Sequence, residues 1–401
     1  LWCGDNEVIG SLHWYPETKA DPERYLANYD RLNSMLGNIV EDEDPGRRFW
    51  PSSPSLGYLD FSDGWHSDTR GDTHYWSVWH EAKDFSAYRD VNPRFASEFG
   101  FQSFTSMNVI ESFARPADMN PSSPVMESHQ RNTGGNARIV ETMLRYFRFP
   151  RDFEQMVFLS QVQQGLAIKT AIEYWRSTKP RCMGALYWQI NDTYPVASWA
   201  SLDYGGQWKL LHYMAKRFFR PINVVVVPEG DQLLIKAIND TAARATIRLE
   251  VHAVGVTGGE RVLVDASVKT SPDKAVVAAR IPLTGLGADE FLFFAWSDAE
   301  GRALGENDYF PKAYKEYEPL PARVKASWSG ADDRPVLTLS TDRPAFFVTA
   351  GVDVPGYFSD NALVLLPGRK VQLSFTPRKG RKVTRAALEK SLRIQHLRQT
   401  Y

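Results

Sequence analysis

The spacing of hydrophobic residues divides the chain into a mixed first half and a β-rich second half. Up to about residue 220, apolar residues recur every three or four positions in several segments, which is typical of amphipathic helices. Helices are expected at 21–36, 138–147, 153–174 and 207–219. Short apolar runs between them predict strands at 1–3, 48–50, 73–78, 95–101 and 183–190. Strands that alternate with helices indicate a parallel sheet covered by helices.

After Pro221 the pattern changes to short strands separated by tight turns. Strands are expected at 223–227, 232–238, 245–254, 261–268, 275–281 and 290–296. Six short strands in one segment predict an immunoglobulin-like sandwich. A linker with two prolines at 316–323 precedes further strands at 335–339, 345–348 and 371–375. We therefore expect three domains, at 1–220, 221–316 and 317–401.

Composition and charge exclude several classes of protein. The 401 residues are 43% hydrophobic and 24% charged, the balance of an ordinary globular protein. The 47 basic residues nearly balance the 48 acidic ones, whereas nucleic-acid binders usually carry a basic excess. No apolar run approaches the roughly 18 residues of a membrane helix. We therefore expect neither nucleic acid nor a membrane as a partner.

Aromatic residues make up 13% of the chain, with 12 Trp. They fill protein cores, but a Trp ring also stacks on the C–H faces of sugars, and composition alone leaves both uses open. The two cysteines cannot form a disulfide framework in a chain of this length. The compartment therefore stays open, and periplasmic, secreted, lysosomal and cytoplasmic locations all fit.

Two glutamates stand at the ends of predicted strands. Glu7 closes the stretch Leu1-Trp2-Cys3-Gly4-Asp5-Asn6-Glu7, and Glu98 interrupts Phe95-Ala96-Ser97-Glu98-Phe99-Gly100-Phe101-Gln102-Ser103. Active sites of (β/α)8 barrels lie at the C-terminal ends of the strands. A carboxylate among aromatic residues is costly to bury unless it is paired or used. Glycoside hydrolysis needs two such carboxyl groups, although each glutamate alone also fits a surface or paired residue.

A third stretch, Gly184-Ala185-Leu186-Tyr187-Trp188-Gln189-Ile190-Asn191-Asp192, predicts one more buried strand that ends in aromatic and amide side chains. Trp188 is expected either to form the floor of a sugar pocket or to fill the core. At about 30 residues per βα unit, Glu7 and Glu98 are about three strands apart, which agrees with successive strands of one sheet.

Together, these motifs resemble the β-mannosidases of glycoside hydrolase family 2. The resemblance also includes Gly71-Asp72-Thr73-His74-Tyr75-Trp76 and Trp199-Ala200-Ser201-Leu202-Asp203-Tyr204. The order and spacing match barrel strands four, six, seven and eight, over roughly residues 1–220 and more weakly beyond. The implied fold is α/β plus all-β: the C-terminal half of a (β/α)8 TIM barrel followed by two immunoglobulin-like β-sandwich domains.

The resemblance implies a retaining exo-β-mannosidase that needs no metal or organic cofactor. Glu98 would be the nucleophile and Glu7 the general acid/base, with their carboxyl groups about 5–5.5 Å apart. The charge on Glu98 would raise the pKa of Glu7. The implied substrate-binding residues are Asn6 at the 2-hydroxyl, Trp188 as the pocket floor, Trp14 as a wall, and His74 and Tyr75, one of which would orient Glu98.

Two details complete this interpretation. The family more often has Asn where this chain has Asp5, which could alter the charge near Glu7. Cys3 and Cys182 would pack on strands that face each other across the barrel, too far apart for a disulfide.

Other specificities and another class of protein remain as alternatives. A β-galactosidase or β-glucuronidase of the same family would use the same two glutamates, and a non-catalytic carbohydrate-binding protein would use only the aromatic surface. The natural β-mannoside also stays open between the N-glycan core Manβ1-4GlcNAc and manno-oligosaccharides.

The sequence also predicts a partner for this chain. Leu1 already lies inside the expected fourth barrel strand, and residues 1–220 supply only strands four to eight. A barrel without three strands would expose two sheet edges and much apolar interior. We therefore expect an N-terminal part of the same enzyme to supply the missing barrel strands and β-domains.

Overall fold

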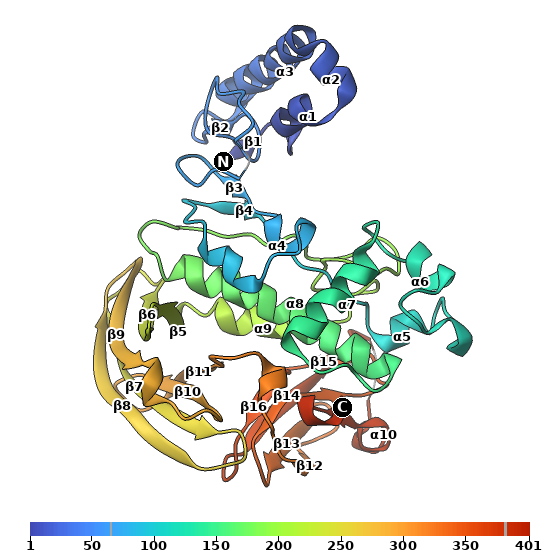
Figure 1. Cartoon of the computed structure of the whole chain (residues 1–401), viewed down its shortest axis with the longest axis vertical. Coiled ribbons are helices and arrows are strands. Elements are labelled where there is room, and N and C mark those ends of the chain that lie inside the picture. Colours follow the sequence, from blue (N-terminus) through green and yellow to red (C-terminus); the bar gives the residue numbers. More distant parts are fainter. Residues whose placement is uncertain (65, 381–382) are drawn as a thin grey trace. The chain divides into compact units, whose positions relative to one another are not determined.

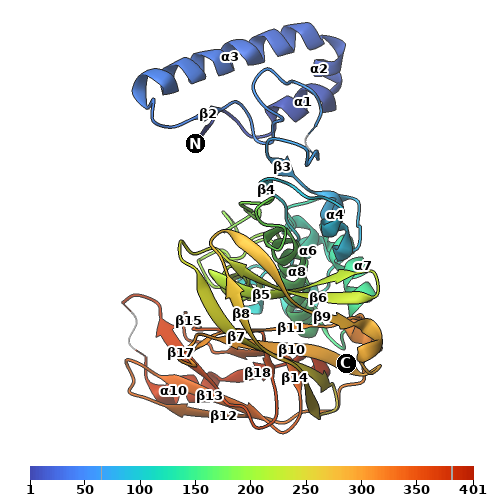
Figure 2. The same ribbon diagram turned by 90° about the vertical axis from the view of Figure 1, so that its left-hand side faces the viewer.

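The computed structural model describes residues 1–64, 66–380 and 383–401. The chain forms two compact units, one made of residues 1–100 and 174–188 and the other of residues 101–173 and 189–401 (Figures 1 and 2). Helix and sheet occur in both. Among the described residues, no helix combines the length and apolar character needed to cross a bilayer.

Parallel strand pairs organise the first unit. Strand β1 (Trp2–Cys3) pairs in parallel with β2 (Phe49–Trp50), and β3 (Thr73–His74) pairs in parallel with β4 (Ala96–Glu98). A further parallel bridge joins Ala96 to Ala185. Parallel pairing of segments in chain order is what the alternation of strands and helices predicts.

The strands predicted in the first unit are shorter than expected, and the one at 95–101 is reduced to β4 (Ala96–Glu98). The strand expected at 73–78 ends at His74, because the chain turns into the short helix α4 (Ser77–His80), where Trp79 N and His80 N both donate to Trp76 O. The stretch 183–190 is extended, but Ala185 makes its one bridge to β4 and no regular strand forms there in the described chain. Aromatic and β-branched residues favour strands in the sequence, but local hydrogen bonds determine the structure.

Helices α1 (Val8–Trp14), α2 (Pro16–Ala20) and α3 (Pro22–Glu43) follow β1, and α3 packs against β2 (Figure 1). The predicted start of α3 is confirmed, because the Asp21 side chain accepts a hydrogen bond from Arg24 N and Pro22 occupies the first turn. Its predicted end at residue 36 is wrong. Gly37 does not end the helix but provides room for the Phe49 ring, which a Cβ atom would approach to 3.3 Å.

Cys3 and Cys182 have different environments. Cys182 is 2% exposed, as a packing residue should be. Cys3 is exposed on β1, in contrast to the packing role expected for it, because in the described chain β1 pairs only with β2.

The second unit begins with helices. The main ones are α7 (Gly135–Tyr146), α8 (Phe153–Arg176) and α9 (Leu210–Phe218), close to the predicted ranges. Short helices α5 (Met107–Ile110) and α6 (Pro124–Ser128) interrupt the long connection before α7. Helices α8 and α9 lie side by side, and a Cβ on Gly165 would come within 2.2 Å of Met214 Sδ (Figure 1). This glycine therefore permits close helix packing.

Two antiparallel sheets enclose one core after α9. The first sheet has the order β5 (Ile222–Glu229), β6 (Gln232–Asn239) and β9 (Lys274–Pro282). The second has the order β11 (Ala303–Tyr309), β10 (Glu290–Ser297), β7 (Ala245–Gly255) and β8 (Glu260–Thr270). Side chains from both sheets, among them Val224, Leu233, Leu249 and Phe294, form one buried cluster.

The last segment also forms two sheets around a core. One contains β12 (Val324–Ser329), β13 (Val336–Thr341), β17 (Val371–Pro377) and β15 (Gly356–Phe358). The other contains β16 (Leu363–Leu365), β14 (Ala345–Gly351) and β18 (Arg393–Gln395). The short helix α10 (Arg385–Ser391) buries Leu388 in their shared core.

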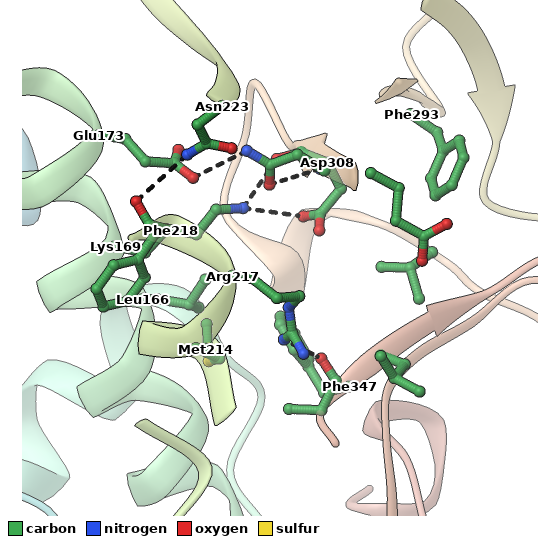
Figure 3. Close-up of a pocket in the computed structure, with 15 residues that line it drawn as sticks. Leu166, Lys169, Glu173, Met214, Arg217, Phe218, Asn223, Phe293, Asp308 and Phe347 are labelled. Carbon is green, nitrogen blue, oxygen red and sulfur yellow. Dashed lines mark hydrogen bonds and ion pairs between the residues drawn. The ribbon is translucent and has the colours of Figure 1, made fainter. Parts of the chain in front are cut away.

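Polar contacts tie the helices of the second unit to its sheets (Figure 3). Lys169 Nζ on α8 donates to Asp308 O on β11 at 3.0 Å. The Asn307 side chain, also on β11, donates to Glu173 Oε1 at 2.8 Å. Arg217 on α9 donates to Ala362 O at 3.0 Å. These bonds line a small cavity between α8, α9 and the two β-sandwiches, and they explain why helices and sheets form one compact unit.

Candidate active site

Glu7 occupies a strained turn between β1 and α1. Its backbone has φ 59° and ψ 14°, in the left-handed region that non-glycine residues rarely adopt. The turn is held on both sides, because Glu7 N donates to Ser53 O at 2.8 Å and Glu7 O accepts from Ser11 N at 3.0 Å. Strain of this kind persists only where surrounding contacts enforce it, and it is common at functional sites.

Glu98 is the last residue of β4 and is 9% exposed. The parallel register places it beside His74, the last residue of β3. Tyr75 N donates to Glu98 O at 2.9 Å, which continues this pairing beyond the strand end. The ends of two parallel strands therefore bring a buried imidazole and a buried carboxyl group together.

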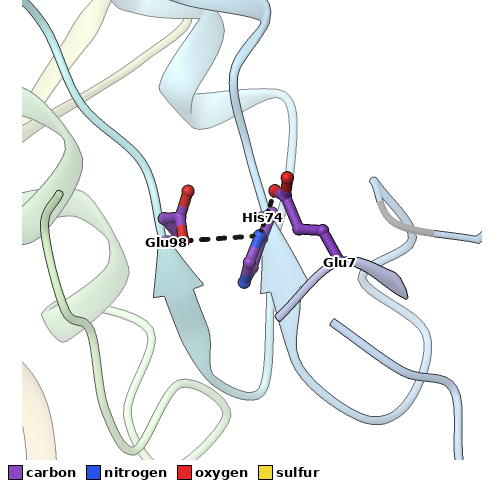
Figure 4. A group of neighbouring side chains, drawn as sticks. All are labelled: Glu7, His74 and Glu98. Atoms are coloured by element: carbon purple, nitrogen blue, oxygen red, sulfur yellow. Dashed lines mark hydrogen bonds and ion pairs between the residues drawn. The ribbon is translucent and has the colours of Figure 1, made fainter. Parts of the chain in front are cut away.

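The His74 ring lies between the two glutamates (Figure 4). Its Nδ1 atom is 2.6 Å from Glu7 Oε1 and 3.7 Å from Glu98 Oε2. One oxygen of each carboxyl group and the ring nitrogen all lie within 4.8 Å of one another. Carboxylate and imidazole ligands could hold a divalent ion at this spacing, but a separation of 2.6 Å is that of a direct charge-assisted hydrogen bond.

Burial raises the pKa of Glu98 to about 7, and the charge of Glu7 contributes in the same direction. His74 and a hydrogen bond from the Trp76 side chain oppose this rise. The Glu98 side chain is 12% exposed, and desolvation disfavours its charged form.

Three residues at the site were not among the sequence candidates. Trp76 bonds Glu98, Ser53 Oγ lies 3.0 Å from His74 Nε2, and Ser53 Oγ donates to Asp72 Oδ2 at 2.7 Å. Asp72 and Trp76 belong to the same motif as His74, so their proximity in sequence was a usable signal. Ser53 lies in the segment after β2, and its position close to His74 depends on how the strands pack.

Asn6 and Trp188 flank the pair of glutamates in different ways. Asn6, next to Glu7, is exposed and forms a parallel bridge with Ser53. Trp188 is 41% exposed, and its backbone N donates to Phe99 O at 2.8 Å, one residue beyond Glu98. Asn6 precedes Glu7 in the sequence, and the backbone of Trp188 pairs one residue beyond Glu98, so both exposed residues are candidates to contact a ligand. Their contacts to a sugar stay predictions.

Tyr75 does not face the carboxyl groups. It is 4% exposed, and its hydroxyl donates to Ala87 O at 3.0 Å, so the ring belongs to the core. The burial of Tyr75 and its bond to Ala87 O give the ring a packing role in this chain, and its contact with substrate stays a prediction. His74 therefore takes the central position.

Trp14 ends α1 and is 38% exposed. A Cβ atom on Gly10 would come within 2.4 Å of its ring, so the indole lies over its own helix. Its role as a pocket wall stays a prediction. Asp5 accepts hydrogen bonds from Ser52 Oγ at 2.5 Å and from Val8 N at 3.2 Å, so this departure from the family pattern supports the start of α1.

Comparisons with known proteins find similarity to β-mannosidases. Residues 320–400 match the model of the mannosidase Ig-fold domain. The chain is 28% identical to a β-mannosidase of Mus musculus over 100% of this chain and 49% of that protein. It is 28% identical to β-mannosidase B of Aspergillus fumigatus, over 92% of this chain and 47% of that protein.

Solved structures give the same result. The β-D-mannosidase of Dictyoglomus thermophilum is 29% identical, with a TM-score of 0.87 over 98% of this chain and 48% of that chain. The exo-chitosanase CsxA of Amycolatopsis orientalis, 17% identical with a TM-score of 0.67 over 92% of this chain and 49% of that chain, shares the fold. The chain spans about half the length of the relatives it matches. Over that span, the chain resembles the C-terminal part of the β-mannosidases of glycoside hydrolase family 2.

Proposed function

We propose that this chain carries the catalytic residues of a retaining exo-β-mannosidase that releases terminal β-D-mannose. The observation that carries the proposal is the pairing of Glu7 and Glu98, whose nearest oxygens lie within 4.8 Å together with His74 Nδ1. Retaining glycosidases hold their two carboxyl groups about 5–5.5 Å apart, whereas inverting enzymes need room for a water molecule between them.

The mechanism uses each carboxyl group once per step. Ionised Glu98 attacks the anomeric carbon while protonated Glu7 donates its proton to the leaving oxygen, so an α-mannosyl ester forms and the aglycone departs as an alcohol. Glu7, now ionised, takes a proton from water, and the resulting hydroxide displaces Glu98. β-Mannose leaves, and both carboxyl groups return to their starting states. Exposed Trp188 and Asn6 are the side chains we expect to hold the sugar.

One observation favours a second assignment in which the roles are exchanged. A carboxyl group with a raised pKa suits a general acid, and the raised pKa here is that of Glu98. Two facts weigh against this reversal. The resemblance implies a nucleophile at Glu98, and the 2.6 Å contact between Glu7 Oε1 and His74 Nδ1 requires a proton between these two atoms, which Glu7 can use as an acid. The stereochemistry of azide rescue separates the two assignments, as described in the Discussion.

We further propose that the parallel strands form the C-terminal half of a (β/α)8 barrel. Two immunoglobulin-like domains would follow, with boundaries near residues 220 and 316.

We also propose that an N-terminal part of the same enzyme completes the site. Exposed apolar side chains in the first unit support such a partner, since Leu186 is 58%, Met183 49%, Trp2 48% and Trp188 41% exposed. Native proteins normally cover the edges of their sheets and the apolar side chains beside them. Full activity of residues 1–401 alone as a soluble monomer would contradict the partner.

Nitrophenyl β-mannoside, β-galactoside and β-glucuronide tested side by side with the complete enzyme would identify the substrate. We expect turnover of the mannoside and its loss in Glu98→Ala. Glu43→Ala, at the exposed end of α3, is the matched control and should retain activity. Preference for another glycoside would favour a different exo-glycosidase of the family, and sugar binding without any turnover would favour a carbohydrate-binding protein.

A further inference from the structure

The carboxylate of Asp72 accepts four hydrogen bonds in the first unit, one of them from Ser53, which contacts His74. Its Oδ1 atom accepts from Trp50 Nε1 at 3.0 Å and from Ser55 N at 2.9 Å. Its Oδ2 atom accepts from Ser53 Oγ at 2.7 Å and from Ser97 Oγ at 2.6 Å. An ionised carboxylate accepts about four hydrogen bonds and donates none, so these four donors satisfy Asp72 as a carboxylate.

This set of hydrogen bonds determines which nitrogen of His74 carries a proton. Ser53 uses its single hydroxyl proton toward Asp72, so toward His74 its oxygen can only accept. His74 Nε2, 3.0 Å from Ser53 Oγ, must therefore carry a hydrogen. In the neutral ring, Nδ1 is then a bare acceptor that faces Glu7.

The short contact between His74 Nδ1 and Glu7 Oε1 now requires one proton. At 2.6 Å, a bare nitrogen and an ionised carboxylate would repel each other, so either Glu7 donates to Nδ1 or a doubly protonated ring donates to Glu7. Glu98 is the second carboxyl group near this nitrogen, with its Oε2 atom 3.7 Å from His74 Nδ1. His66 is a further titratable group, and the charge of His74 contributes to lowering its pKa.

We infer that Asp72 and Ser53 are positioning residues. They fix the His74 ring so that His74 Nδ1 and the carboxyl group of Glu7 share one proton. The inference rests on the proposed function and extends it. General acid catalysis needs that proton on Glu7 in the first step, when it is transferred to the leaving oxygen and departs with the aglycone. In the second step Glu7 takes a proton from water, which restores the proton shared with His74. In this proposal Asp72 and Ser53 act through His74 and not through a contact with the substrate.

Asp72→Asn in the complete enzyme tests the inference most directly. The new amide can donate to Ser53, which can then donate to His74 Nε2, so the ring hydrogen moves to Nδ1 and Glu7 accepts it as an ionised group. We expect kcat/KM for an alkyl mannoside to fall by about 10²–10⁴-fold, the usual contribution of a general acid. A dinitrophenyl mannoside, whose leaving group needs no proton, should lose less than about tenfold. The alkaline limb of the pH profile should move to lower pH.

Matched variants separate this role from a structural one. Ser53→Ala should lose more rate on the alkyl mannoside than on the dinitrophenyl mannoside, as Asp72→Asn does, but to a smaller degree. Ser53→Thr, which keeps the hydroxyl, should behave like the parent enzyme. Ser97→Ala removes a bond to the same Asp72 oxygen but leaves Ser53 and His74 linked, so the leaving-group dependence should stay as in the parent. If Asp72→Asn does not fold, the comparison of Ser53→Ala with Ser53→Thr still tests the inference.

The outcomes distinguish this inference from the proposed function. A parent enzyme that cleaves no mannoside would overturn the proposed function itself. An active parent whose Asp72→Asn and Ser53→Ala variants lose rate equally on both substrates, with the alkaline limb unmoved, would overturn the positioning role alone.

Discussion

Replacing Glu98 by Gln should stabilise the folded chain at and above neutral pH while it removes activity. In the folded state the pKa of Glu98 rises from its ordinary value of 4.5 to about 7, mainly because the group is buried. One pKa unit corresponds to about 1.36 kcal/mol, so ionising this carboxyl group in the fold costs about 3 kcal/mol. A glutamine of nearly the same shape does not ionise, and the variant avoids that cost.

The sign follows from proton binding in the two states. Between pH 4.5 and 7 the unfolded chain has released the Glu98 proton and the folded chain still holds it, so the free energy of unfolding falls as pH rises. Below pH 4.5 both states are protonated, and above about 7 both are ionised. The stability difference between Glu98→Gln and the parent should therefore be constant below pH 4.5, grow by about 3 kcal/mol up to neutral pH, and then level off.

Urea denaturation of parent and variant at half-unit steps from pH 4 to 8.5, followed by tryptophan fluorescence, measures this difference. Hydrogen bonds that the glutamine amide of the variant makes or loses change the stability difference between variant and parent by the same amount at every pH, and they leave its pH dependence unchanged. Glu111→Gln, which removes an exposed carboxyl group, is the control and should give a difference close to flat over this range. A flat difference for Glu98→Gln, or one that grows toward acid pH, would refute the reasoning from burial.

Three further outcomes concern catalysis by the complete enzyme. Glu98→Ala should abolish turnover of an activated mannoside, and azide should restore it with α-mannosyl azide as product, since the anion fills the space of the nucleophile; a β-azide would assign Glu98 as the acid/base instead. Glu7→Ala should slow alkyl mannosides about 10²–10⁴-fold more than dinitrophenyl mannoside, and equal losses would give Glu7 another role. The rate should fall as pH drops below about 7, because Glu98 must be ionised to attack, and an acidic limb near 4.5 would show that substrate or further chain removes the shift.

Helices with a clear capping signal could be predicted from the sequence with good accuracy. Asp21 and Pro22 begin α3 as local chemistry requires, since both act through the nearest turn of backbone. The end of α3 could not be predicted in the same way. Gly37 is a common helix terminator, but here it serves the packing of Phe49, a residue that lies beyond the helix in sequence.

Strands were predictable where alternation or apolar runs were strong, and missed where they were not. Strand β11 (Ala303–Tyr309) contains Gly, Glu, Asn and Asp, and most of its residues are only half-buried. It pairs with β10 on one side, so the neighbouring sheet rather than its own composition holds it in place. Strands β15, β16 and β18 are three residues each, too short for a pattern along the sequence to show them, and each pairs with one neighbouring strand.

The two glutamates were predictable, because a carboxyl group at the end of an apolar strand is unusual and the chemistry needs two. The shared proton that we infer for Glu7 and His74 was not predictable. The left-handed turn at Glu7, the register that sets His74 beside Glu98, and the approach of Ser53 to Asp72 are all tertiary contacts. Each depends on how separate strands align, which a pattern along one chain does not record.

The placement of Glu98 connects stability, protonation and catalysis in this chain. The strand end that makes the carboxyl group reachable by His74 and Trp76 is also what removes water from it and raises its pKa. Any substitution that relieves this cost by removing the charge also removes the nucleophile that we propose. Stabilising and inactivating changes should therefore coincide at this position, as is expected where a fold carries strain for the sake of its chemistry. The strained backbone of Glu7, at the opposite side of His74, fits the same pattern.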